Sequence, residues 1–317
     1  MSCPTFSIII PVKPGGAVRA LEPLMQIDYP TESFEVLVAE GTRPSLQRNL
    51  AAQQSRGEYL YFLDDDSLVS PEFLRLAASC YAAYSPAVVG GPSLTPPGDT
   101  LLQRAFGLAL ASPFGGGGVR NRYRRYGSVR ETGDHELILC NLSISAKVFR
   151  EAGGFDRRLY PNEENELLVR LKRKGLTLIH DPGLAVLRSQ RASFKAFTRQ
   201  LFGYGRGRAQ QMLLGGGCGV ANLVPSLFLL YLTALPFLDK PVYYIPLLCY
   251  LGMAFLFSCS AGIGRGKAAP ALLLPIVFPV LHICYGAGVI WGLLSSGFAR
   301  RTHASGGVEV KRVKDFA

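Results

Sequence analysis

Short apolar runs alternate with longer amphipathic stretches over the first 190 residues of the chain. The runs are rich in β-branched and aromatic residues, which is typical of buried strands. We expect strands at residues 6–12, 34–39, 59–63, 87–91, 137–144 and 176–180. Helices are expected between them at residues 17–26, 45–55, 71–84 and 163–174, the third with Ser70 as N-cap and Pro71 at its first position. The alternation predicts an α/β domain with a mainly parallel sheet, whose ligands bind at the carboxyl ends of the strands.

The hydropathy pattern changes after residue 221. Three apolar segments follow, at residues 222–238, 242–260 and 268–296, and each is long enough to cross about 30 Å of hydrocarbon. Three complete crossings would place residues 298–317 on the opposite side from the first domain. The basic side chains of this tail favour the cytoplasmic side instead. An incomplete third crossing, broken by Pro270, Pro275 and Pro279, would reconcile the two, and the number of crossings stays open.

These patterns predict four consecutive parts. Residues 1–190 form the α/β domain, 191–221 a basic amphipathic segment, 222–297 the membrane region, and 298–317 a basic tail. In the second part, residues 194–212 read as a helix lying at a membrane surface, with phenylalanine and leucine on one side. Residues 115–118 are four glycines, and together with the arginines that follow they predict a mobile loop.

Composition and charge agree with a membrane-bound enzyme. The mean hydropathy of +0.19 is too high for an average soluble enzyme and too low for a transporter made only of helices. The net charge is +11, and two basic stretches, between Asp99 and Glu131 and between Asp181 and Asp239, contain no acid. Basic stretches beside a membrane segment indicate contact with lipid phosphates or a phosphorylated substrate rather than nucleic acid.

The N-terminus and the cysteines indicate a cytoplasmic first domain. Residues 7–12 are too short for the apolar core of a secretion signal, and no basic segment precedes them. The seven cysteines form no CxxC pair, which favours free thiols in a reducing compartment over disulfides or a zinc site.

Three adjacent acids, Asp64, Asp65 and Asp66, follow the third predicted strand. Like charges at the end of a buried strand are costly unless a cation neutralises them. Asp64 and Asp66 are two residues apart, so in extended backbone their side chains point the same way. This arrangement suits a divalent ion held between carboxylates and a substrate diphosphate. A solvated turn that caps the next helix is the alternative.

The order of several motifs resembles family 2 glycosyltransferases of the GT-A fold, over roughly residues 5–210. The matching pieces are Ser7–Val12, Phe34–Val38, Arg48–Ala51, Gly57–Asp66, Gly153–Asp156 and Asn162–Leu171. Each motif is weak by itself, and the ordered set is specific.

The resemblance implies a role for each matched position. The nucleotide sugar would contact Pro11, Val12, Glu40, Arg48, Asp64 and Asp65, and a divalent ion, Mn²⁺ or Mg²⁺, would bind Asp64 and Asp66. Glu163 and Glu164 match the acidic pair of the family, and Glu164 is favoured over Glu163 as the catalytic base. An acidic first turn that complements the helix dipole is the alternative for this pair.

Two departures from the family pattern change the expectation. Arg188 stands near the place where many members carry a histidine that completes the metal shell, so the third protein ligand is unidentified. His180 lies earlier, within a predicted strand, and is expected to be structural. The Q-x-x-R-W motif of processive polysaccharide synthases is absent, which favours adding one sugar per encounter.

The basic residues are candidates for gripping an acceptor phosphate. This set comprises Arg120, Arg122, Arg124, Arg125, Arg199 and Arg206. A solvated, arginine-rich surface is the alternative interpretation for the segment from Arg120 to Arg130.

Together these features predict an inverting, metal-dependent transfer of a sugar from a nucleoside diphosphate donor, expected to be a UDP-sugar, to a lipid-linked acceptor. An undecaprenyl-diphosphate oligosaccharide at the bacterial inner membrane fits, with the first domain facing the cytoplasm and the product a cell-surface polysaccharide. The alternatives are transfer to a bare polyprenyl phosphate and a catalytically silent membrane scaffold. A nucleotidyltransferase is disfavoured because no glycine-rich segment of sufficient length follows the first strand.

Overall fold

The computed structural model describes residues 3–215, 219–264, 266–295 and 307–316. The chain forms two compact units. The sheet unit comprises Met1–Leu94, Asn121–Arg188 and Thr302–Ala317, and the helical unit comprises Thr95–Arg120 and Ser189–Arg301. The two units therefore interleave along the chain, whereas the sequence predicted consecutive parts.

Within the described part of the sheet unit, the main sheet has the strand order β10-β2-β1-β3-β7-β4-β8-β6. It is mixed rather than mainly parallel: β1 runs parallel to β2 and β3, and β4 to β8, whereas β6, β7 and β10 run antiparallel to their neighbours. A second, small sheet pairs β5 with β9 in parallel. The strands are β1 (Phe6–Val12), β2 (Phe34–Glu40), β3 (Tyr59–Leu63), β4 (Val88–Gly90), β5 (Ser93–Leu94), β6 (Arg130–Glu131), β7 (Asn141–Ser145), β8 (Leu178–His180), β9 (Val186–Leu187) and β10 (Glu309–Lys314).

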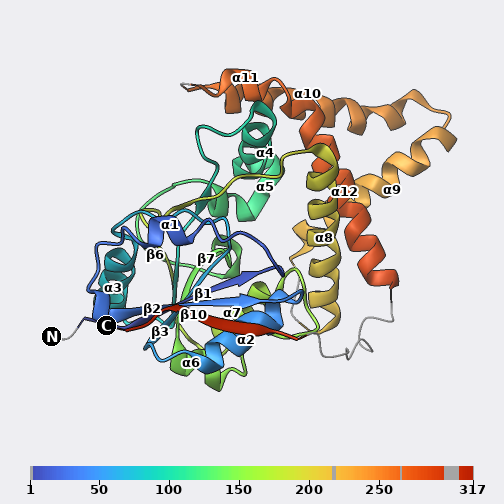
Figure 1. Cartoon of the computed structure of the whole chain (residues 1–317). Coiled ribbons are helices and arrows are strands. Elements are labelled where there is room, and N and C mark those ends of the chain that lie inside the picture. The colour runs from blue at the N-terminus through green and yellow to red at the C-terminus, as the bar shows by residue number, and fades with distance from the viewer. Residues whose placement is uncertain (1–2, 216–218, 265, 296–306, 317) are drawn as a thin grey trace. The chain divides into compact units, whose positions relative to one another are not determined.

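The central strands are apolar on both faces because helices cover both faces of the sheet. Ile8 and Ile10 of β1 belong to one buried cluster, and Ile9 belongs to the other, as the alternation of side chains along a strand requires. The first cluster includes residues of α1 (Leu21–Leu24) and α3 (Phe73–Tyr84). The second includes residues of α2 (Pro44–Gln54), α6 (Ala146–Glu151) and α7 (Glu163–Arg173). Figure 1 shows α1 on one side of the sheet and α2, α6 and α7 on the other.

The predicted strands and helices of this unit are present, with some boundaries wrong. The helix expected at residues 17–26 is reduced to α1, and the helix expected from Pro71 begins at Phe73 with Glu72, not Ser70, as its N-cap. The strand expected at residues 137–144 begins at Asn141, because the preceding residues turn and the Asn141 N–H donates to the Ile138 carbonyl. Apolar residues in such turns are buried without being strand, so periodicity alone misplaces the boundary.

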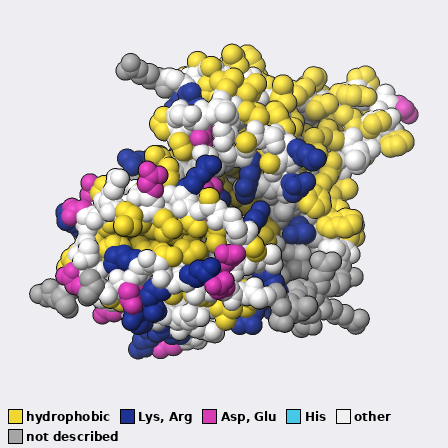
Figure 2. Space-filling model, viewed as in Figure 1, with side chains coloured by type: hydrophobic (Ala, Val, Ile, Leu, Met, Phe, Trp, Pro, Cys, Tyr) yellow, Lys and Arg dark blue, Asp and Glu magenta, His cyan; other side chains and the backbone are white. Residues whose placement is uncertain are grey.

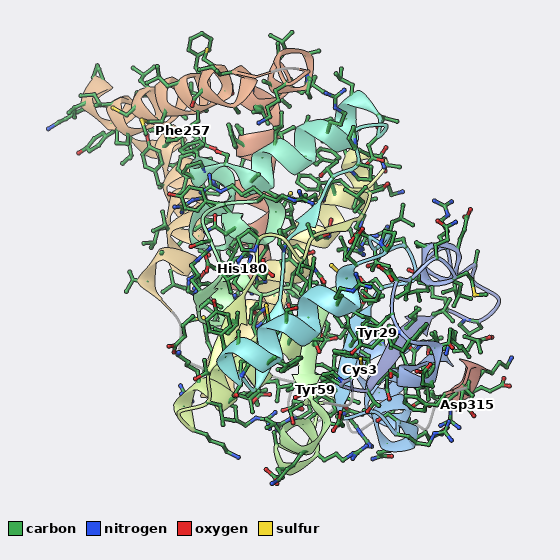
Figure 3. The ribbon with its side chains drawn as sticks, turned by 90° about the vertical axis from the view of Figure 1, so that its left-hand side faces the viewer. Cys3, Tyr29, Tyr59, His180, Phe257 and Asp315 are labelled. Atoms are coloured by element: carbon green, nitrogen blue, oxygen red, sulfur yellow. The ribbon has the colours of Figure 1, made fainter. Side chains whose placement is uncertain are left out.

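The C-terminal tail contributes a strand to the main sheet. β10 pairs antiparallel with β2, so that Glu309 lies opposite Glu40. Arg312 forms an ion pair at 2.7 Å with Glu35, which is fully buried. Figure 3 shows Asp315, just past β10, at the rim of this unit. Part of the predicted basic tail, residues 309–314, is thus a strand of the sheet, which the sequence analysis did not predict, and residues 298–306 lie outside the described range.

The glycine run and the first arginines after it are helical, whereas residues 124–129 form a loop as predicted. Residues Pro113–Gly116 form α5, and Gly117–Tyr123 form a 3₁₀ helix. Beyond it, Glu136 is buried and accepts hydrogen bonds from Asn121, Arg130 and Thr132. This cluster holds the segment from residue 121 to residue 136 together.

The helical unit is organised around the packing of α8 (Phe194–Leu213) against α12 (Leu274–Leu294). Glycines allow the two backbones to approach closely: a Cβ atom at Gly205 would lie 2.1 Å from the Tyr285 carbonyl oxygen, and one at Gly288 would lie 2.1 Å from the Phe202 carbonyl oxygen. The side-by-side arrangement is visible in Figure 1. Helix α4 (Leu101–Ala111), which sequence reasoning missed, stacks Phe106 on Phe197 of α8 with 3.9 Å between ring centroids.

Among the described residues of this unit, three helical stretches are long and apolar enough to cross a membrane: Val220–Phe237, Pro241–Gly262 and Leu274–Leu294. The first contains α9 (Val224–Ala234), the second α10 (Ile245–Gly262), and the third is α12. Figure 2 shows apolar side chains gathered over this region. The third apolar segment is split into α11 (Ala268–Ala271) and α12, and α12 continues through Pro279.

Candidate active site

The carboxyl ends of three parallel strands meet at one edge of the sheet. Val12 and Glu40 face each other at the ends of β1 and β2, and β3 ends at Leu63 on the other side of β1. The Gly15 N–H donates to the Glu40 carboxylate at 3.1 Å, which closes the turn after β1. Pro11 and Val12 are buried in β1. The residues predicted to line a nucleotide pocket thus lie together at this edge.

The acidic triplet forms a tight turn directly after β3. The Asp64 N–H donates to the Ser67 hydroxyl at 3.2 Å, and the Ser67 N–H donates to the Asp64 carbonyl at 3.1 Å. Next along the chain, Leu68 and Leu187 exchange two backbone hydrogen bonds of 2.8 Å. This bridge brings the end of β9 beside the triplet.

Arg188 follows β9 and forms ion pairs with two of the three acids. Its Nη2 lies 3.0 Å from Asp64 Oδ2, and its Nε lies 2.6 Å from Asp66 Oδ1. The two carboxylates therefore point toward one cation, as the spacing of two residues predicts. Burial raises the pKa of Asp65, and the charges of Asp66 and Asp64 raise it further.

Arg48 connects the triplet to the acidic pair. From α2, its Nη2 lies 2.8 Å from Asp64 Oδ1 and its Nη1 lies 3.0 Å from Glu163 Oε1. Both the Arg48 and the Glu163 side chains are almost completely buried, at 5% and 2% exposure. Burial raises the pKa of Glu163 to about 7, although the charge of Arg48 opposes the rise. Two motifs that lie about 100 residues apart in the sequence thus share one charged network.

Glu164 is the more accessible member of the acidic pair. It lies on the first turn of α7, and its side chain is 12% exposed. Its Oε1 accepts a hydrogen bond from the Asn165 amide at 3.2 Å and lies 3.8 Å from Nη1 of Arg122. The helix has acids in its first turn and bases in its last, which complements the helix dipole. This favourable interaction with the helix dipole is compatible with a catalytic role for Glu164.

Asn49, next to Arg48 on α2, holds the glycine motif in place. Its amide donates to the Phe155 carbonyl at 2.8 Å and accepts from the Phe155 N–H at 3.0 Å. Gly154 has φ of +73°, and a Cβ atom there would lie 2.7 Å from the Asn49 amide oxygen. The neighbouring residues of α2 thus bind two different motifs, which accounts for their occurring together in the sequence pattern.

The arginines predicted to grip an acceptor have different surroundings. Arg122 is buried: its guanidinium donates to the backbone carbonyls of Asp134 and His135 and to Asn165. It therefore supports the first turn of α7, while Arg125 is exposed on the same unit. Arg124 lies between these two in the chain and donates to Asn121 at 2.8 Å. Arg120, Arg199 and Arg206 belong to the helical unit, where Arg199 is exposed.

The donor set at the triplet fits a divalent cation. Asp64 and Asp66 already converge on the Arg188 guanidinium, and carboxylate oxygens are the ligands that Mg²⁺ and Mn²⁺ prefer. The ion pairs of this network join four acids to three arginines. Within the described residues, no third acid, histidine or cysteine completes a metal site, so further ligands would come from water or the substrate.

His180 is structural, as predicted. It is fully buried in β8, which is separated from β3 by β7 and β4. Burial lowers its pKa, so the imidazole is neutral at pH 7. Figure 3 shows it in the interior.

Sequence reasoning missed three groups that shape this site. The ion pairs of Arg188, the buried position of Arg122 and the hydrogen-bonded cluster at Glu136 were not anticipated. A signal existed only for Arg188, which stands where the family pattern has a metal ligand. The other two depend on contacts between segments that no local pattern reveals.

Comparison with solved structures gives the fold of this chain. A mannosyltransferase, PcManGT from Pyrobaculum calidifontis, solved in complex with GDP-Man and Mn²⁺, matches with a TM-score of 0.55 and 13% identity over 93% of this chain and 88% of that one. TarS residues 1–349 from S. aureus, solved in complex with UDP-GlcNAc, matches with a TM-score of 0.45 and 14% identity over 89% of this chain and 90% of that one. The likeness to PcManGT shows that this chain has the GT-A fold.

The family follows from a sequence match. The model of glycosyl transferase family group 2 matches residues 59–263, and the chain belongs to this family. Succinoglycan biosynthesis protein ExoA of Rhizobium meliloti (strain 1021) is 28% identical over 170 residues, which are 53% of this chain and 49% of that protein. The match thus spans about half the length of this curated relative.

Proposed function

We propose that this glycosyltransferase moves a sugar, with inversion, from a nucleoside diphosphate donor to a lipid-linked acceptor in the assembly of a cell-surface polysaccharide. Family membership supports the transfer of a sugar, and the name of the partial relative ExoA supports polysaccharide assembly. The three apolar helices support an acceptor that resides in a membrane. We assign the enzyme to the bacterial inner membrane with its sheet unit in the cytoplasm, where nucleotide sugars are made.

One observation carries the proposal: Arg48 joins the acid that would hold the donor to the acidic pair that contains the proposed base. It binds Asp64 on one side and Glu163 on the other, and Glu164 follows on the same helical turn. Inverting transfer needs a leaving group stabilised on one side of the anomeric carbon and a base on the opposite side. A rigid buried link between the two acidic groups fixes their separation.

Glu164 acts as the base in this scheme. Glu163 is 2% exposed and bound to Arg48, so it cannot reach a substrate hydroxyl, whereas Glu164 is more accessible and lies beside Arg122. A divalent ion held by Asp64 and Asp66 would offset the charge that develops on the leaving diphosphate. The exposed Arg125 and Arg199 are available for the phosphates of a lipid-linked acceptor or of the bilayer.

The test replaces Glu164 by Gln and measures donor binding and sugar transfer separately. The variant is expected to bind UDP with Mn²⁺ as the wild type does and to lose transfer about 10²- to 10⁴-fold. Glu166→Gln is the matched control, because Glu166 is on the same turn but pairs with Arg170 at 2.8 Å. Unchanged turnover of Glu164→Gln would rule out its role as base.

The same measurements separate the alternatives. A bare polyprenyl phosphate is already anionic, so that acceptor predicts retained transfer in Glu164→Gln and loss in Asp66→Ala. A catalytically silent scaffold predicts that the wild type does not bind the nucleotide. A screen of nucleotide sugars, read as radiolabel entering the lipid phase, would then identify the sugar and the nucleotide.

A further inference from the structure

The position of Arg188 is fixed by backbone contacts on two sides. Its N–H donates to the Leu94 carbonyl of β5 at 2.9 Å, and the preceding Leu187 exchanges two hydrogen bonds with Leu68. The guanidinium can therefore reach the acidic turn without any change in the backbone. It forms an ion pair with one carboxylate oxygen of Asp64 and with one of Asp66.

A divalent ion and this guanidinium compete for the same carboxylates. A small divalent ion binds oxygen at about 2.0 to 2.6 Å, so an ion between Asp64 and Asp66 would lie within a few ångströms of Arg188. Two cations so close repel each other where water is partly excluded. Ion binding therefore requires Arg188 to leave at least one of its partners.

Arg188 is better placed to move than Arg48. The Arg48 side chain is 5% exposed and remains bound to Glu163 when Asp64 changes partner. The Arg188 side chain is 19% exposed, and both of its ion-pair partners would be the ion's ligands. A released guanidinium at the rim of an acidic site needs a new anion, and a phosphate accepts two parallel N–H bonds from it.

We propose that Arg188 exchanges partners during binding: it pairs with Asp64 and Asp66 in the empty site and with the donor's diphosphate once a divalent ion has taken the carboxylates. This inference rests on the proposed nucleotide-sugar donor. The exchange couples the binding of the two ligands. An ion that binds alone displaces Arg188 from its carboxylates and leaves the guanidinium without a new anion. When the diphosphate binds as well, it pairs with the displaced guanidinium. Each ligand then strengthens the binding of the other by the same factor.

The test measures Mn²⁺ binding to the full-length protein in detergent, by the EPR signal of free Mn²⁺, with and without UDP or GDP. In the wild type we expect the better of the two nucleotides to tighten Mn²⁺ binding about tenfold or more. In Arg188→Gln, Mn²⁺ alone should bind more tightly than in the wild type, the nucleotide should bind more weakly in the presence of Mn²⁺, and the coupling factor should fall toward one. Arg75→Gln is the control, since Arg75 pairs with Asp28 on the surface.

The outcomes separate this inference from the proposed function. A wild type that binds neither nucleotide overturns the proposed donor and this inference with it. Nucleotide binding with an unchanged coupling factor in Arg188→Gln, or weaker binding of Mn²⁺ alone in that variant, overturns the partner exchange and leaves the proposed function intact. Thermal unfolding of each variant verifies that it is folded.

Discussion

Glu136 offers a quantitative test of how much its hydrogen-bonded cluster, in the segment from residue 121 to residue 136, stabilises the fold. Burial alone would raise its pKa, but hydrogen bonds from Arg130, Asn121 and Thr132 lower that pKa from 4.5 to about 2. A lowering of this size corresponds to about 3 kcal/mol of stability at neutral pH. Because the Arg130 side chain is 28% exposed, solvent screening reduces the figure to about 2 kcal/mol. Glu136→Gln should therefore lower the unfolding temperature by about 4 to 8 °C at pH 7.

The pH dependence of this loss distinguishes the ionised cluster from packing. The pKa of Glu136 is lower in the folded chain than in the unfolded one, so its contribution is present above pH 4.5 and disappears as the pH falls toward 2. Thermal unfolding followed by circular dichroism should show the gap between wild type and Glu136→Gln shrinking by roughly half between pH 7 and pH 3. Glu131→Gln is the matched control, because Glu131 is 60% exposed. A gap of equal size at both pH values would refute the electrostatic reasoning.

Two further substitutions test buried contacts in the two units. Arg48→Met leaves Asp64 and Glu163 without their shared cation and should cost about 3 to 5 kcal/mol in urea unfolding, whereas a loss below 1 kcal/mol would show that the link contributes little. Gly205→Ala should reduce the thermal stability of the solubilised protein, because its Cβ would lie 2.1 Å from a carbonyl oxygen of α12. Gly252→Ala, with open space around its Cβ, should not, and equal effects would contradict the close packing of α8 on α12.

The main strands and the acidic residues could be predicted because their signals are local. The run at β3 followed by three aspartates can be recognised in a short window, and the spacing of Asp64 and Asp66 correctly predicted that their side chains point the same way. That Arg188 lies between these two carboxylates could not be predicted, because the bridge between Leu68 and Leu187 brings it there. Pairings between distant segments leave no periodicity in the sequence.

The arginine-rich segment shows that composition alone also fails to predict which charged residues are buried. Four glycines and several arginines are typical of a solvated loop, and composition gives no reason to bury Arg122. It is buried because Asn165 and two backbone carbonyls together satisfy its guanidinium. Local composition thus indicates which environments are favourable for a segment, but contacts with distant residues determine whether it is exposed or buried.

The C-terminal strand bears on the number of membrane crossings, which hydropathy left open. β10 is hydrogen-bonded to β2 within the main sheet, and this pairing would keep residues 309–314 on the same side of a membrane as that sheet. Three complete crossings between residues 220 and 294 would separate the two strands and leave the buried Glu35 without Arg312. We therefore expect an even number of crossings. Green fluorescent protein fused to either terminus should fluoresce in the cytoplasm, whereas alkaline phosphatase fused to the C-terminus should be inactive. An active C-terminal phosphatase together with a fluorescent N-terminal fusion would show an odd number of crossings and contradict the pairing of β10 with β2.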